Sequence, residues 1–156
     1  MPEEVQFFAV FMRWMHITGA VVAAGGSIFG LFVMLPALRG LENEVRSDIM
    51  ESVRKRFFVL FTVGIAMLLV SGFYNYIVNE IPAHQGQGLY HGLMWAKIVL
   101  AMIVFFVGSA LVGRSQAFEG LRRKRRRWMR RNVILLLVIL VLAAILRAMP
   151  DVVASQ

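Results

Sequence analysis

Residues Phe57–Val78 read FFVLFTVGIAMLLVSGFYNYIV, and this stretch contains no Asp, Glu, Lys or Arg. The hydrocarbon core of a bilayer is about 30 Å thick and a helix rises about 1.5 Å per residue, so one crossing needs roughly 20 apolar residues. Every backbone N–H and C=O group in lipid must find an internal partner. The stretch is therefore predicted to be a transmembrane helix.

Three further segments have the same apolar character. The predicted spans are residues 6–38, 57–78, 89–113 and 132–149. The first is longer than one crossing needs, so we expect it to tilt or to project from the membrane. The sequence thus predicts an all-α fold, an integral membrane four-helix bundle formed as a single domain by residues 1–156.

Proline and glycine mark the expected ends of these helices. Pro36 and Gly40 are expected to end the first helix, and Pro150 to stop the fourth. Pro82 and Gly86 are expected to lie in the short turn between the second and third helices.

The composition excludes several kinds of site. Hydrophobic residues make up 59% of the 156 residues, compared with about 45–50% in soluble domains. Because there is no cysteine, disulfides, thiolate zinc sites, iron–sulfur clusters and cysteine nucleophiles are excluded. No Ser-His-Asp order or phosphate-binding glycine loop stands out, and Asp and Glu lie outside the predicted spans. Hydrolytic and nucleotide chemistry are therefore not expected, and these observations disfavour an enzyme without deciding the question.

The net charge of +8 is distributed unevenly along the chain. All Lys and Arg residues except Arg13, Lys97 and Arg147 lie in two loops, residues 39–56 and 114–131. By the positive-inside rule these two loops are cytoplasmic, so the remaining loop and both termini face outward. We therefore expect a multi-pass protein of the cell inner (plasma) membrane.

The basic loops also indicate the partners of the chain. The run LRRKRRRWMRR could contact nucleic acid, but beside an apolar span, with Trp128 at the boundary, it is more typical of a membrane anchor. We expect the lipid bilayer and anionic lipids as partners, and no nucleic acid; a membrane or periplasmic partner protein is a further option. Glu3 and Glu4 oppose the cationic start of a cleavable signal peptide, so Met1 is expected to begin the mature chain.

Three cations lie inside predicted spans, each towards the outer end of its helix. A charge in a span costs about 2.5–3.5 kcal/mol on insertion scales, so it usually faces the bundle interior or reaches the interface. Arg13 and Arg147 either extend their side chains to the membrane interface or face a binding site, and the sequence supports both equally. Lys97 lies deeper, and we expect it to be buried or to face a site.

All three histidines fall on the outer side of the predicted topology. His16 lies within the first helix and His91 opens the third, whereas His84 lies in the outer loop and is expected to be solvated. Gly19 and Ala23 share the helical face of His16. These small residues either leave space beside the imidazole or allow close helix packing, and the sequence favours neither.

Two kinds of metal chemistry fit these residues. Imidazole and thioether ligands suit Cu(I), a soft ion. The candidate copper ligands are Met12, Met15, His16, His91 and Met94. Methionine is also a common core filler, so packing is the alternative explanation for these thioethers.

Haem b is the second option. His16 and His91 could be axial ligands, with Arg13 or Arg147 pairing the propionates and Lys97 adding a further cation. Both options place the bound group in a pocket at the outer end of the bundle.

The motifs of three spans resemble those of the copper-resistance protein D family. The first has His16 followed by Gly25-Gly26, the second has Ser-Gly-Phe-Tyr-Asn at 71–75, and the third has Tyr-His-Gly-Leu-Met-Trp-Ala-Lys at 90–97. His91 stands where that family more often has glycine. The resemblance implies copper uptake or resistance at the inner membrane.

The membrane-embedded protoporphyrinogen oxidases are a more distant resemblance. They are similar in the first-helix His16 and in Trp95-x-Lys97 of the third helix, and this resemblance implies haem b. The chain has Phe-Val-Met-Leu-Pro at 32–36 where that group has Tyr-x-x-Arg, so the oxidase is the weaker hypothesis. The leading hypothesis is a copper protein acting in passage, resistance or sensing. The alternatives are a haem b protein and a structural subunit of a membrane complex without its own site.

Overall fold

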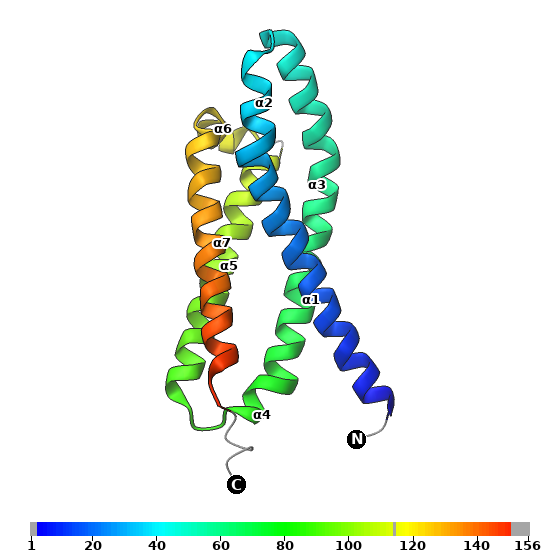
Figure 1. The fold of residues 1–156 in the computed structure, drawn as a ribbon, viewed down its shortest axis with the longest axis vertical. Coiled ribbons are helices and arrows are strands. Elements are labelled where there is room, and N and C mark those ends of the chain that lie inside the picture. Colours follow the sequence, from blue (N-terminus) through cyan, green and yellow to red (C-terminus); the bar gives the residue numbers. More distant parts are fainter. Residues whose placement is uncertain (1–2, 114, 151–156) are drawn as a thin grey trace.

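The computed structural model describes residues 3–113 and 115–150, which form an all-α bundle (Figure 1) without a strand in that part of the chain. Four helical stretches are long and apolar enough to cross a membrane, as the sequence predicts: Gln6–Gly40, Asn43–Ala83, Gly88–Val112 and Arg125–Ala148. In chain order the elements are α1 (Glu3–Phe29), π-helical η1 (Gly30–Met34), α2 (Leu35–Ala37), η2 (Leu38–Gly40), α3 (Asn43–Tyr74), π-helical η3 (Asn75–Glu80), α4 (Ile81–Ala83), α5 (Gly88–Val112), η4 (Gln116–Phe118), α6 (Glu119–Arg123) and α7 (Arg125–Ala148).

Gly40 ends the first helical stretch, as predicted, but the roles predicted for Pro36 and Pro82 are wrong. Pro36 lies within a helical stretch that continues to Gly40, and Pro82 lies in α4, which continues η3 directly. Proline removes an N–H and its ring clashes with the carbonyl four residues earlier. A wider π-helical segment comes before each proline, and such segments accommodate irregularities of this kind. Proline in these helices therefore adjusts the winding without ending the helix.

The helices also extend past the predicted spans at the basic end. Only Leu41 and Glu42 separate η2 from α3, so most of the expected first loop is helix. α7 likewise begins at Arg125, within the expected third loop. α2 and the start of α3 thus form a hairpin that projects at the top of Figure 1. The end of α7 and α4 lie at the opposite end, where the start of α1 diverges from them.

The bundle is built from two helix pairs, α1 with α3 and α5 with α7. α1 and α3 approach most closely at two glycines. A Cβ on Gly19 would lie 2.8 Å from the carbonyl oxygen of Gly64, and one on Gly64 would lie 3.0 Å from Val22. Ala23, one turn further, is 1% exposed. The small residues after His16 thus serve close packing, and at Gly19 they leave no space for a bound group.

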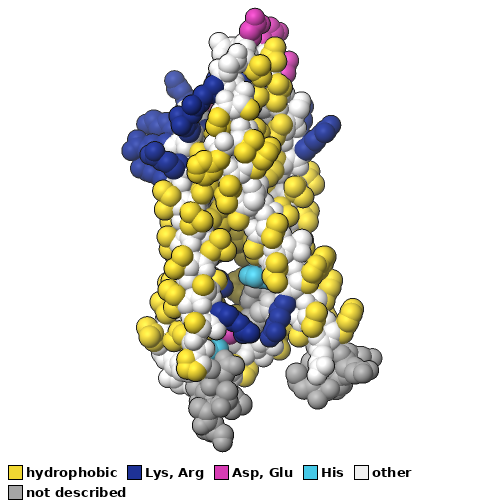
Figure 2. Space-filling view, in the orientation of Figure 1, with side chains coloured by type: hydrophobic (Ala, Val, Ile, Leu, Met, Phe, Trp, Pro, Cys, Tyr) yellow, Lys and Arg dark blue, Asp and Glu magenta, His cyan; other side chains and the backbone are white. Residues whose placement is uncertain are grey.

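The outer surface of the bundle is strongly apolar. Figure 2 shows hydrophobic side chains over the length of all visible helices, with most basic side chains towards one end, acidic ones at its tip and a few further basic side chains near the opposite end. Such an extended apolar surface is expected of a protein whose solvent is lipid. The most exposed large side chains include Phe7, Val21, Phe32, Val59 and Leu89.

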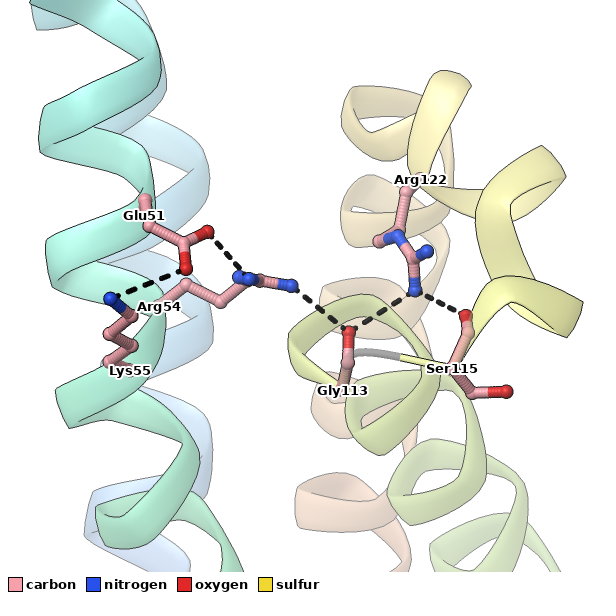
Figure 3. Close-up of polar contacts among 6 residues, drawn as sticks. All are labelled: Glu51, Arg54, Lys55, Gly113, Ser115 and Arg122. Carbon is pink, nitrogen blue, oxygen red and sulfur yellow. Dashed lines mark hydrogen bonds and ion pairs between the residues drawn. The ribbon is translucent and has the colours of Figure 1, made fainter.

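A polar contact joins the helices at the basic end (Figure 3). The carbonyl oxygen of Gly113, at the end of α5, lies 3.4 Å from Nη1 of Arg54 on α3 and 3.2 Å from Nη1 of Arg122 on α6. Arg122 also donates to the Ser115 carbonyl at 2.7 Å, and Arg54 donates to Glu51. Cations at a helix C-terminus are stabilising because the last carbonyls carry partial negative charge. These arginines therefore fix the end of α5 against its neighbours.

Candidate metal site at the histidine end

His16 projects from α1 towards α3. Its ring is half-buried, and Nδ1 lies 3.1 Å from Oγ of Ser71, whose side chain is 0% exposed. A Cβ on Gly72 would lie 3.2 Å from Cε1 of His16, so glycine at this position lets the ring approach α3. The imidazole is thus held between two helices in one orientation.

The hydrogen bonds of Ser71 determine the tautomer of His16. The Ser71 hydroxyl donates its only proton to the carbonyl of Met67 at 2.5 Å. Towards His16 it can then only accept, so Nδ1 of His16 carries the hydrogen. In a neutral imidazole this leaves the lone pair on Nε2. Metal-binding histidines are commonly oriented in this way, by a hydrogen bond from the nitrogen that does not bind.

His91 is arranged differently. Its Nε2 lies 3.1 Å from the carbonyl oxygen of His84, which only accepts, so this nitrogen carries the hydrogen. Its Nδ1 then accepts from the hydroxyl of Tyr76 at 3.3 Å. Both ring nitrogens are engaged by the protein. His91 could bind a metal only by giving up one of these bonds.

The expectation that His84 is solvated is wrong. His84 is 3% exposed, and its ring stacks on that of Tyr90 with centroids 3.5 Å apart and an interplanar angle of 4°. Its Nδ1 lies 3.1 Å from the carbonyl oxygen of Glu80. The turn closes through Gly86, at φ 79°, and folds His84 onto the start of α5. Glycine adopts this φ readily, which makes so tight a return possible.

Glu80 is the residue at this end that sequence reasoning missed. Its carboxylate accepts from the hydroxyl of Tyr90 and lies 3.6 Å from Nδ1 of His84. The ammonium of Lys97, half-buried on α5, interacts electrostatically with both Glu80 and His16. The predicted second span ended two residues before Glu80. The Glu80–His84 spacing of one helical turn was the signal that could have revealed it.

The remaining candidate residues lie on α1, α5 and α7. Met12 is 8% exposed on α1, whereas Met94, also 8% exposed, packs with Tyr90 and Leu146. Met15 is partly buried. The side chains of Arg13 and Arg147 are exposed, as groups that reach the interface would be.

Among the described residues, no group of three or more His, Asp or Glu side chains could hold a metal ion. Thioethers are outside that set of ligands. A metal centre built on His16 would therefore have methionine sulfur, a backbone group or an external molecule as its other ligands.

Comparisons with protein-family models, with curated proteins and with solved structures found no match to the chain. The candidate site is thus defined by its own geometry: one oriented imidazole with a lone pair, beside a polar network of Tyr76, Glu80, His84, Tyr90, His91 and Lys97.

Proposed function

We propose that the chain is a plasma-membrane protein of the copper-resistance D type that binds Cu(I) through His16, for copper passage, resistance or sensing. The observation that carries the proposal is the Nδ1–H···Ser71 contact, which leaves the lone pair of His16 on Nε2. A thioether is the natural second ligand for this soft ion. Met12 is buried one turn before His16 on the same helical face.

The charges at this end favour a monovalent ion. Lys97 adds a positive charge near His16, and Glu80 offsets it. Like charges repel strongly where the dielectric constant is low. A singly charged Cu(I) is therefore better tolerated here than a divalent ion. A single ion also needs no large cavity, in keeping with the close packing around Gly19.

The proposed orientation places His16 towards the outer face of the membrane. It rests on the concentration of Lys and Arg at the opposite end of the bundle, which Figure 2 shows. There the basic loops would meet anionic lipids of the cytoplasmic leaflet. A membrane or periplasmic protein could deliver or remove copper at the outer face.

Labelling of an introduced cysteine tests this orientation without background, because the chain has no cysteine of its own. Gln85 is exposed in the turn before α5 and is a suitable position. Gln85→Cys should react with a membrane-impermeant maleimide added to intact cells. Reaction only after the cytoplasmic side is opened would reverse the proposed topology.

Haem b is the second candidate. Figure 2 shows a hollow at the histidine end, between the α1/α3 pair and α7, with a histidine at its margin and basic side chains below it. The Nε2 lone pair of His16 would equally suit an axial ligand. Arg13, Arg147 and Lys97 would supply cations for propionates. His91 would have to exchange its two hydrogen bonds to serve as the second axial ligand.

The test combines an absorption spectrum with metal analysis of the purified protein. The proposal predicts a colourless protein that binds one equivalent of Cu(I) per chain in competition with a chromophoric chelator. His16→Ala should lose this binding, while His84→Ala should keep it. A Soret band that His16→Ala abolishes would replace copper by haem. Absence of both signals would leave a structural subunit of a larger complex.

A further inference from the structure

A separate, partly open cavity of about 120 Å³ lies at the basic end of the bundle, between all four long helices. Its size is comparable to the roughly 150 Å³ apolar cavity that accommodates benzene in another protein, so it can enclose only part of a larger molecule. Most of its wall is apolar. The principal apolar side chains are Phe29, Met34, Phe57, Phe61, Leu111 and Met129.

Four polar residues, Ser27, Arg54, Arg125 and Asn132, complete the wall of this cavity. The Ser27 hydroxyl is already used, because it donates to the carbonyl oxygen of Ala23. Asn132 is 3% exposed, and its Oδ1 is buried without a hydrogen-bond partner in the described part of the chain. The Nε–H of Arg125 is likewise buried and unpartnered there. A buried donor or acceptor left without a partner costs about 1–3 kcal/mol. The cavity thus presents one unused donor and one unused acceptor.

The charge around the cavity is also unbalanced. The guanidinium groups of Arg54 and Arg125 are close enough to repel each other. Arg54 has Glu51 as a partner, whereas no ion pair is found for Arg125 among the described residues. An anion between the helices would relieve this repulsion and satisfy the Nε–H of Arg125.

The arginines of the wall lie at the depth expected for a lipid head group, and the apolar side chains lie at the depth expected for its acyl chains. Arg54 lies three residues and Arg125 seven residues before the predicted apolar spans, whereas Asn132, Phe61 and Leu111 lie within them. A phosphate group at the level of the arginines would leave its acyl chain beside the aromatic and aliphatic wall. Basic pockets between transmembrane helices bind anionic head groups in this way.

We propose that this cavity binds one anionic phospholipid whose head group carries a hydroxyl, such as phosphatidylglycerol. The phosphate accepts from Arg125, and the head-group glycerol folds back along α7 so that one of its hydroxyls donates to Oδ1 of Asn132. Both unused groups are then satisfied by one molecule. This site is independent of the copper proposal, because it shares no residue with the histidine end.

Native mass spectrometry of the detergent-purified protein tests the proposal with phosphatidylglycerol, phosphatidic acid, phosphatidylcholine and inorganic phosphate as probes. One phosphatidylglycerol should be retained per chain, with phosphatidic acid weaker and phosphatidylcholine absent. Arg125→Gln should weaken retention about tenfold, the scale of one charge-assisted hydrogen bond. Arg130→Gln is the matched control, because Arg130 is exposed on the same helix.

Arg125→Gln should still fold, since it removes one of two repelling charges, and its thermal melting in detergent checks this. Asn132→Leu should remove the preference for phosphatidylglycerol over phosphatidic acid. Equal losses from Arg125→Gln and Arg130→Gln would show surface attraction only and overturn the proposal. Displacement of the lipid by millimolar inorganic phosphate would identify a free-anion site and overturn it equally.

Discussion

The two ends of the bundle differ in the surroundings of their partly buried cations. At the histidine end, the Glu80 carboxylate accepts a hydrogen bond from the Tyr90 hydroxyl and attracts the ammonium of Lys97. Both ring nitrogens of His91 are hydrogen-bonded. At the basic end, Arg125 lines the same cavity as Arg54, the two cations repel each other, and the Nε–H of Arg125 has no partner in the described part of the chain. Lys97 thus has a carboxylate close enough to attract it, whereas Arg125 makes no ion pair among the described residues.

This contrast indicates what each end can accept. Glu80 offsets the charge of Lys97, so the neighbouring His16, which Ser71 orients, can take an ion of low charge. An unbalanced cationic cavity needs an anion from outside. The variants below are chosen to break or sharpen this contrast.

The largest effect is expected at Ser71. Ser71→Ala removes the group that orients His16, and loss of such a partner typically costs about 10–100-fold in metal affinity. Chelator competition would measure the Cu(I) affinity. Ser27→Ala is the control, because Ser27 also donates to a helix carbonyl, that of Ala23 at 2.7 Å, but lines the cavity at the basic end. An unchanged affinity in Ser71→Ala would mean that the serine does not orient a ligand.

The next effect concerns the packing of α1 on α3. Gly19→Ala places a Cβ 2.8 Å from a backbone oxygen, and overpacking of this kind costs about 1–3 kcal/mol in the free energy of unfolding. Gly25→Ala meets nothing within 4 Å and should be neutral or slightly stabilising, since alanine favours helix. Unfolding in mixed detergent micelles would measure both. Equal stability of the two variants would contradict the close approach.

The attraction between Glu80 and Lys97 at the histidine end is tested by Glu80→Gln. The variant leaves Lys97 without its carboxylate, and the expected loss is about 1–2 kcal/mol, reduced because the Glu80 side chain is 33% exposed. The double variant Glu80→Gln/Lys97→Met should be more stable than the sum of the two single losses predicts. Glu44→Gln, exposed near the start of α3, serves as the control. Strict additivity would show that the two charges are not coupled.

The smallest effect is expected at the basic end outside the cavity. Arg122→Ala removes the donor to the carbonyls of Gly113 and Ser115, which should cost about 0.5–1 kcal/mol. Arg123→Ala changes an exposed neighbour and should have no measurable effect. The same micelle unfolding assay distinguishes the two variants. Identical unfolding curves for Arg122→Ala and Arg123→Ala would show that Arg122 does not stabilise the end of α5.

The four spans were predictable because insertion of a helix into lipid depends mainly on the apolar composition of about 20 consecutive residues. A run such as Phe57–Val78 is apolar whatever surrounds it. The helix ends were less predictable, because π-helical segments absorb the effect of Pro36 and Pro82. Proline chemistry alone does not reveal this adjustment.

The details of the site depended on the turn before α5. His84 is buried because the turn at Gly86 folds it back onto α5. The spacing of hydrophobic residues does not predict this turn. Glu80 lay outside the apolar window, although a turn of helix brings it to Tyr90 and His84. The distinction between His16 and His91 requires the identity of each hydrogen-bond partner, and this comes only from the structure.

The role of His16 is tested most directly by X-ray absorption spectroscopy at the copper edge of the Cu(I)-loaded protein. The account predicts a low coordination number, with imidazole nitrogen and thioether sulfur in the first shell. The outer-shell scattering of the imidazole should persist in His91→Ala and be absent from any copper that His16→Ala retains. Imidazole scattering that survives in His16→Ala and disappears in His91→Ala would contradict the assignment of His16 as the ligand.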